Sequence, residues 1–276
     1  TDVYFIIRDC TIHEGKSGDK YGIYLYKVIN GKMDNVTSYN NYCGIHLDSS
    51  SNDIISACTV YDNSWYGIGM NYSSSNTITN CAVHNNRDGI YLYSSSNNII
   101  IDCVVYKESQ RGVLLYSSSN NNQITNCNVY YNSYEGIMLS SSSNNRISNC
   151  TAYSNIWGIE LGSSSNNLIT NCTIYNNSWH GISLYSSSDN QIHYCNIYNN
   201  SRYGIWNYNT TAIYELNATY NWWGNASGPY HSTTNPNGTG NAVSDNVLYE
   251  PWLTEPVTGT SQPLEGTPFE IPGTYI

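Results

Sequence analysis

A phrase of about 23 residues recurs along most of the chain, and this repeat constrains the fold more than any other feature. Most copies contain a glycine followed by a branched aliphatic residue, then a serine-rich run, an isoleucine, a cysteine and a tyrosine. The glycines lie 22 to 24 residues apart, at Gly22, Gly44, Gly67, Gly89, Gly112, Gly136, Gly158, Gly181 and Gly204. Repetition at a fixed period of this length is typical of solenoids and propellers, in which each repeat forms one structural unit.

Within each repeat, apolar residues alternate with polar ones over short stretches, as in Ile90 and Leu92 or Cys81 and Val83. This spacing is that of β-strands, and Ser, Asn and Gly separate the stretches. The chain contains no helical segment to connect strands, so the pattern predicts an all-β fold, a three-sided parallel β-helix of about nine to ten coils. One coil buries too few aliphatic side chains to offset its loss of conformational entropy, and the coils must therefore stabilise one another.

A cysteine recurs at the same place in seven successive coils. These residues are Cys58, Cys81, Cys103, Cys127, Cys150, Cys172 and Cys195. Val36 takes the equivalent place one coil earlier, so the position requires a small apolar side chain. We predict a ladder of buried free thiols, because parallel strands in register hold the sulfur-bearing carbons too far apart for disulfides. Cys43 lies outside this ladder, and we expect its thiol to be reachable from solvent.

Composition excludes several classes of function. The net charge of −10 leaves no basic stripe for a phosphate backbone, so nucleic-acid binding is not expected. No apolar run is long enough to span a membrane. The six histidines show no metal-ligand spacing, and we expect no metal, cofactor or catalytic residue. The carboxylates are scattered over the repeat, and we expect them and the histidines to be solvated. We expect Glu135 and Glu160 to lie one coil apart, with their positions in the repeat offset by one residue.

Two sets of residues could mediate surface contacts. A column of aromatic residues follows the cysteines, and a second aromatic cluster lies in the turn before the repeated glycine. We predict surface or glycan contact by Tyr61, Tyr106, Tyr130, Tyr153, Tyr175 and Tyr198 of the column and by Trp157 and Trp179 of the second cluster. Such rings could equally pack against a neighbouring molecule or protect the sheet. Acceptor sequons for N-glycosylation begin at Asn35, Asn71, Asn176, Asn199, Asn209, Asn225 and Asn237.

The phrase Ser-Ser-Ser-Asn-Asn-x-Ile-x-Asn-Cys-x-x-Tyr-x-Asn-x-x-x-Gly-Ile-x-Leu resembles the right-handed parallel β-helix proteins of the NosD-like group, common among secreted and surface proteins of methanogenic archaea. The resemblance covers residues 1–216 and implies a right-handed solenoid. Residues 217–253, with Asn221-Trp222-Trp223-Gly224 and Pro251-Trp252-Leu253, resemble the closing module of such chains. Residues 254–276 are rich in proline and are expected to be extended.

Some proteins of that group deliver copper and others act on carbohydrates, but this chain has no matching motif for either activity. We therefore predict an extracellular, non-catalytic structural or adhesive element that self-associates head to tail. One alternative is a carbohydrate-binding module that uses the aromatic columns. The others are a polysaccharide lyase or hydrolase and a copper-binding accessory protein. A polysaccharide is a further expected partner.

Overall fold

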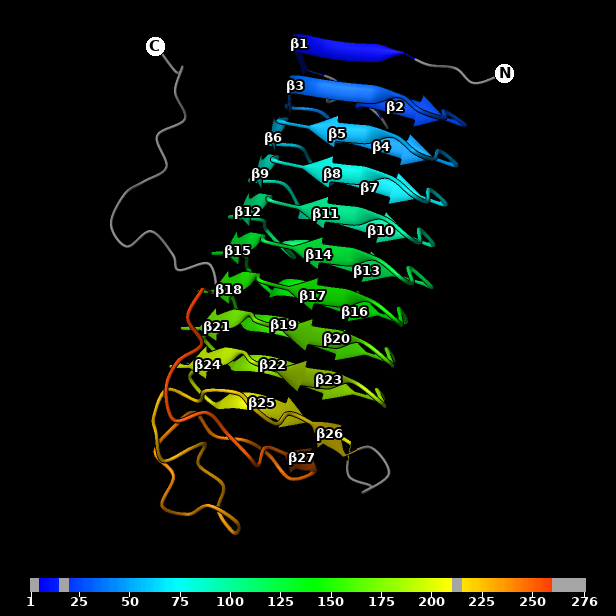
Figure 1. Cartoon of the computed structure of the whole chain (residues 1–276). Coiled ribbons are helices and arrows are strands. Elements are labelled where there is room, and N and C mark those ends of the chain that lie inside the picture. Colours follow the sequence, from blue (N-terminus) through cyan, green and yellow to red (C-terminus); the bar gives the residue numbers. More distant parts are fainter. Residues whose placement is uncertain (1–4, 15–19, 210–214, 260–276) are drawn as a thin grey trace, which may run out of the picture.

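The computed structural model describes residues 5–14, 20–209 and 215–259. These residues form a stack of β-coils that runs the length of the molecule (Figure 1). Every strand pairing within the stack is parallel and joins a residue to its equivalent one coil later, as in Ile68↔Ile90 and Ile90↔Val113. The predicted three-sided parallel β-helix is confirmed. Within the described ranges, no helix is long and apolar enough to cross a membrane.

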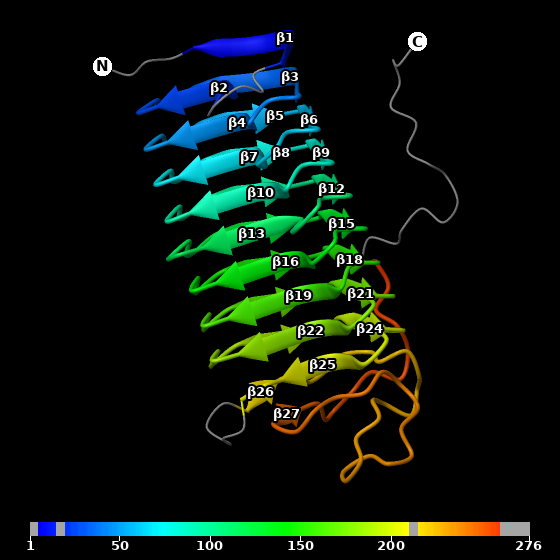
Figure 2. The ribbon, with the colours of Figure 1, turned by 180° about the vertical axis from the view of Figure 1, so that it is seen from behind.

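The first face of the solenoid is a nine-stranded sheet (Figure 2). Its strands are β2 (Tyr21–Tyr26), β4 (Cys43–Asp48), β7 (Tyr66–Asn71), β10 (Asp88–Tyr93), β13 (Val113–Tyr116), β16 (Glu135–Ser140), β19 (Trp157–Gly162), β22 (His180–Tyr185) and β25 (Tyr203–Asn207).

The other two faces belong to one 18-stranded sheet, joined through two long first strands, β1 (Ile6–His13) and β3 (Lys32–Tyr39). The second face continues with β5 (Ile54–Ser56), β8 (Thr77–Thr79), β11 (Ile99–Ile101), β14 (Gln123–Thr125), β17 (Arg146–Ser148), β20 (Leu168–Thr170), β23 (Gln191–His193), β26 (Leu216–Asn217) and β27 (Val247–Leu248). The third face contains β6 (Thr59–Tyr61), β9 (Ala82–His84), β12 (Val104–Tyr106), β15 (Asn128–Tyr130), β18 (Thr151–Tyr153), β21 (Thr173–Tyr175) and β24 (Asn196–Tyr198).

Asparagine recurs in the repeat because it stabilises the turns between the faces of the solenoid. The residue before the repeated cysteine turns the chain from the second face to the third in a left-handed conformation, with φ of 53° at Asn80, 54° at Asn126 and 53° at Asn149. Asparagine is among the few residues that adopt this conformation routinely. The serine-rich runs form another corner, where Asn76 Oδ1 accepts a hydrogen bond from the Asp53 amide at 2.9 Å and its Nδ2 donates to Asn98 Oδ1 at 3.2 Å. These amide ladders satisfy backbone groups that the turns leave unpaired.

The core is a dry column of aliphatic side chains and thiols. The repeated isoleucines, leucines and valines are almost completely buried, as are the seven cysteines predicted to form the ladder. Each thiol donates to a carbonyl two residues earlier, and along part of the ladder it accepts an amide hydrogen bond from the preceding coil, as between Cys150 Sγ and Cys127 N at 3.5 Å. Burial raises the pKa of the Cys150 and Cys195 thiols, which disfavours metal binding there.

The two ends of the stack differ. Residues from the proposed closing module cover the last coil, where Trp223 is fully buried in the core and Val243 forms a bridge to Ile205. At the other end Ile7, Cys10 and Ile12 of β1 are only partly buried (Figure 1). Self-association through this edge stays a prediction, as do the three segment boundaries. Most of the proline-rich tail lies outside the described residues.

Candidate functional site

The outer face of the nine-stranded sheet carries a charged cluster in an otherwise weakly charged protein. In each coil, the residue just before the repeated glycine points outward at the start of the strand. Three successive coils place Asp88, Arg111 and Glu135 there, and the backbone bonds from Gly89 N to Arg111 O and from Gly112 N to Glu135 O fix their stacking. Two carboxylates therefore lie on either side of one guanidinium group.

The cluster is held by ion pairs at short range. Arg111 Nε lies 3.0 Å from Glu135 Oε2, and Arg111 Nη1 lies 3.6 Å from Asp88 Oδ1. The Arg111 backbone amide also donates to Asp88 Oδ1, at 3.2 Å. The Nε contact with Glu135 does not have hydrogen-bond geometry, so it is an electrostatic pair between two buried atoms. Arg87 adds a second cation, with its Nε 3.9 Å from Asp88 Oδ2.

Burial changes the acidity of these carboxyl groups. The side chains of Asp88 and Glu135 are only 3% and 7% exposed, whereas that of Arg111 is 27% exposed. Loss of solvation raises the pKa of both carboxyl groups, and the Arg111 charge partly opposes this effect. Glu160, one coil further along, also has a raised pKa, because of burial and the nearby charge of Glu135.

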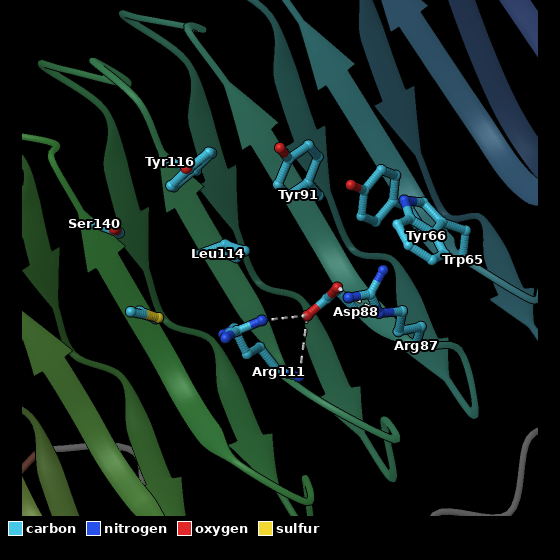
Figure 3. A pocket seen from close by; sticks show the side chains of 10 residues that line it. Trp65, Tyr66, Arg87, Asp88, Tyr91, Arg111, Leu114, Tyr116 and Ser140 are labelled. Carbon is cyan, nitrogen blue, oxygen red and sulfur yellow. Dashed lines mark hydrogen bonds and ion pairs between the residues drawn. The ribbon is translucent and has the colours of Figure 1, made fainter.

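A pocket of about 310 Å³ opens beside the cluster (Figure 3). The Leu114 and Met138 side chains, which point outward from β13 and β16, supply apolar surface. The Tyr66 and Tyr91 rings stack with centroids 4.1 Å apart at one side. The remaining lining residues are Trp65, Arg87, Asp88, Arg111, Tyr116 and Ser140.

Rigid contacts hold the pocket walls. The Arg87 guanidinium lies 3.6 Å from the Trp65 ring centre, which is a cation–π contact between neighbouring coils. Burial, together with the adjacent Tyr66 hydroxyl, raises the pKa of Tyr91 far above that of a free phenol. Tyr91 is therefore protonated at neutral pH.

Several sequence-based expectations about polar residues are wrong. Asp88, Glu108 and Glu135 are buried rather than solvated, and so are His46, His180 and His231. Cys43 is 1% exposed and not reachable, because it lies in the same outward column between Tyr21 and Tyr66. The register pairs Glu160 with Met138, and Glu135 with Trp157, so the two glutamates are offset by three residues rather than one.

The predicted tyrosine column exists on the third face. Its rings stack on one another through His84, with centroids 4.8 to 5.3 Å apart between Tyr61 and Tyr198. Neighbouring rings cover one another's faces, so a glycan on this column would meet ring edges and hydroxyl groups. Trp157 lies apart from it, at the start of β19 beside Glu135, and Trp179 stacks on Arg202 at 3.8 Å. Glycan contact by these residues stays a prediction.

The sequon asparagines differ in accessibility. Asn35, Asn176, Asn199, Asn225 and Asn237 are exposed, and Asn71 is half-buried. Asn209 is buried, and its Nδ2 donates to Asn207 Oδ1 at 2.8 Å and to Ser187 O at 3.1 Å, which opposes its glycosylation in the folded chain.

Sequence reasoning missed the charged cluster, although a signal was present. The position before the repeated glycine is aromatic in most coils, but it is Asp, Arg and Glu in three consecutive ones. Within the described ranges, no group of three or more His, Cys, Asp or Glu residues could hold a metal ion.

Comparison with known proteins reveals the same fold in enzymes. The A-module of the mannuronan C-5 epimerase AlgE6 from Azotobacter vinelandii is 17% identical over 91% of this chain and 75% of its own, with a TM-score of 0.72. A variant of the periplasmic alginate epimerase AlgG is 16% identical over 79% of this chain, with a TM-score of 0.71, but the match spans only 60% of that protein. The pectate lyase Pel9A is 14% identical over 90% of this chain and 70% of its own, with a TM-score of 0.62.

These comparisons contradict the prediction of a non-catalytic structural or adhesive element, because the similar solenoids are those of two epimerases and a lyase. A comparison with curated proteins found no match. The family model described as "Right handed beta helix region" matches residues 1–133 and 120–248, which together span most of the chain. The protein therefore belongs to the right-handed β-helix family.

Proposed function

We propose that this protein is an enzyme that acts on an acidic polysaccharide by removing the proton next to a uronate carboxylate, as a lyase or an epimerase. The observation that carries the proposal is Arg111, held between Asp88 and Glu135 beside a tyrosine-lined pocket. The similarity of the coil stack to alginate epimerases and a pectate lyase supports it. Such a reaction needs a cation, a base and a proton donor, and this pocket contains residues of all three kinds.

Arg111 and Arg87 would bind the substrate carboxylate. Their charge makes the neighbouring C5–H bond more acidic, because it stabilises the negative charge that develops on the carboxylate when the proton leaves. Asp88 is the best-placed base, since its carboxylate lines the pocket and burial raises its pKa toward neutrality. The C5–H electron pair then moves into the substrate carboxylate, and the proton moves to Asp88.

Tyr91 would complete the reaction as the proton donor. In a lyase, the electron pair returns to form the C4–C5 double bond, the C4–O bond breaks, and Tyr91 protonates the leaving oxygen. In an epimerase, Tyr91 delivers a proton to C5 from the opposite face. Either role requires a protonated phenol in the resting enzyme, in agreement with the raised pKa of Tyr91.

The test is incubation with polymannuronate, polyguluronate and polygalacturonate, and with a neutral polysaccharide as a control. Formation of unsaturated uronate ends, or a change in the ratio of C5 epimers, supports the proposal. We expect Arg111→Gln to lower kcat/KM by about 10²-fold or more, because it removes the charge that stabilises the intermediate. Arg146→Gln, on the exposed second face, is the matched control and should have wild-type activity. Equal activity of both variants would refute the assignment.

We further propose that the protein works outside the cytoplasm, where such polysaccharides occur. The periplasmic designation of the similar epimerase AlgG supports this location. The NosD-like relationship and the archaeal origin stay predictions, supported by the repeat phrase. Glycosylation at the exposed sequons also stays a prediction.

A further inference from the structure

A second and larger cavity lies at the opposite end of the nine-stranded sheet from β2. It has a volume of about 750 Å³ and is lined by the end of β25 and by residues of the proposed closing module between 231 and 249. Trp206 forms part of its wall, and His231, Thr234, Asp245 and Tyr249 also line it. This cavity is separate from the pocket at Arg111 and shares no residue with it.

The polar side chains in this cavity form a continuous relay. Thr234 Oγ1 lies 2.8 Å from His231 Nδ1, and His231 Nε2 lies 3.2 Å from Asp245 Oδ1. The Tyr249 hydroxyl is hydrogen-bonded to Thr234 Oγ1. A hydroxyl, an imidazole and a carboxylate in this order are the arrangement of an activated nucleophile, its general base and the group that orients the base.

The backbone determines which nitrogen of His231 carries the proton. The Thr234 amide donates to Nδ1 at 3.2 Å, so Nδ1 of the neutral ring is an acceptor. The proton is therefore on Nε2, which donates to Asp245. This tautomer leaves Nδ1 as the acceptor for the Thr234 hydroxyl proton, and Asp245 stabilises the imidazolium that forms.

The general base of the relay is buried and its nucleophile is exposed, as catalysis requires. His231 is 8% exposed, whereas Thr234 is exposed. The base is therefore shielded from water while the nucleophile can meet a substrate. Tyr249 is buried and its hydroxyl reaches the same oxygen, so it is the nearest donor for an oxyanion that forms on a carbonyl attacked by Thr234.

We propose that this cavity is a second active site, which hydrolyses a carboxylic ester with Thr234 as the nucleophile. The Thr234 oxygen forms a bond to the ester carbonyl carbon, its proton moves to His231 Nδ1, and the carbonyl π electrons move to the oxygen beside Tyr249. When the intermediate collapses, the carbon–alkoxy bond breaks and the alcohol leaves with the proton from Nδ1. Water then cleaves the acyl-threonine by the same path, which yields the acid and restores the threonine hydroxyl.

The charges around the cavity indicate the class of ester. Glu215 and Asp245 line it, and neither lysine nor arginine is among its described lining residues. Carboxylates facing the cavity repel an anionic acyl group, so the substrate is a neutral ester. The Trp206 ring offers an apolar surface for a sugar or another compact alcohol. An O-acetyl group on a carbohydrate has both properties.

The experiment uses the full chain and p-nitrophenyl acetate. We expect release of p-nitrophenol with an initial burst, and mass spectrometry of the quenched protein should place one acetyl group on Thr234. Thr234→Ala should lower kcat/KM by about 10³-fold or more. Asp245→Asn, at an exposed side chain, should lower it by about 10²-fold and weaken the burst. Ser232→Ala, an exposed neighbour, should behave as the wild type.

Two further observations decide the outcome. Circular dichroism must give the same spectrum and melting profile for Thr234→Ala and Ser232→Ala, because loss of the fold would also remove activity. Arg111→Gln should retain ester hydrolysis, which separates this site from the polysaccharide reaction. Turnover by Thr234→Ala equal to that of Ser232→Ala, acetylation at another residue, or no turnover by the folded wild type would each overturn the proposal.

Discussion

Glu108 is a buried carboxyl group in a ladder otherwise built of asparagine, and its removal should change how stability depends on pH. It is 1% exposed and occupies the place of Asn63, Asn86 and Asn132 in neighbouring coils. Glu108 Oε2 accepts a hydrogen bond from the Asn86 amide, and the Glu108 amide donates to Asn132 Oδ1 at 3.0 Å.

The sign of the effect follows from the pKa. Burial raises the pKa of Glu108 well above its ordinary value of 4.5, the nearby charge of Asp88 acts in the same direction, and hydrogen bonds from Asn86 oppose it. Below pH 4.5 the group is protonated in both the folded and unfolded chains and has no effect on the pH dependence. Above that pH only the unfolded chain releases the proton, so the free energy of unfolding falls by about 1.4 kcal/mol per pH unit until the folded pKa is reached.

We expect Glu108→Gln to abolish this decline while retaining an acceptor for the Asn86 amide. The assay is urea denaturation of both proteins at several pH values above 4.5. Stability of the variant relative to the wild type should rise by about 1.4 kcal/mol per unit of pH. Asp62→Asn, at an exposed carboxylate, is the control and should follow the wild type. A Glu108→Gln profile parallel to that of the wild type would refute the reasoning.

Three further predictions test other parts of the molecule. Polyuronate binding should tighten as the pH is lowered, because the carboxyl groups with raised pKa values around Arg111 take up protons at a higher pH than ordinary carboxyl groups do, and Glu135→Gln should flatten this dependence in calorimetric titrations. Gly112→Ala should unfold the middle coils, since its Cβ would lie 2.6 Å from Gly136 O, and hydrogen exchange would detect the loss of protection. Cys127 and Cys150 should react with a bulky thiol reagent only after denaturation, because both are completely or almost completely buried, and rapid labelling of the native protein would contradict the dry core.

The solenoid could be predicted from the sequence because its core repeats. The side chain of Ile90 packs between Ile68 and Val113 of the neighbouring coils, so each must be apolar and of similar size. The inward positions therefore recur at the period of the repeat and can be identified from the sequence. The same logic identified the cysteine ladder, since the thiol position also accepts Val36. Corner asparagines follow the period for a backbone reason, their left-handed conformation.

The outward positions carry no such constraint, and this explains what the sequence did not reveal. Asp88, Arg111 and Glu135 become a cluster only because three coils stack, and they are scattered when the chain is read linearly. Cys43 was expected to be accessible because it lies outside the thiol ladder, but aromatic neighbours from adjacent coils cover it. The His231 relay depends on a turn in residues that do not repeat.

Transfer of solvent deuterium to C5 of a polyuronate tests the central claim most directly. Both a lyase and an epimerase remove the C5 proton, whereas a hydrolase or a binding protein does not. In deuterated water, nuclear magnetic resonance should show deuterium at C5 of the epimerised residues, or C4–C5 unsaturation if the chain is cleaved, and Arg111→Gln should suppress the signal. A folded wild-type protein that binds polyuronates but leaves every C5–H bond intact would contradict the account.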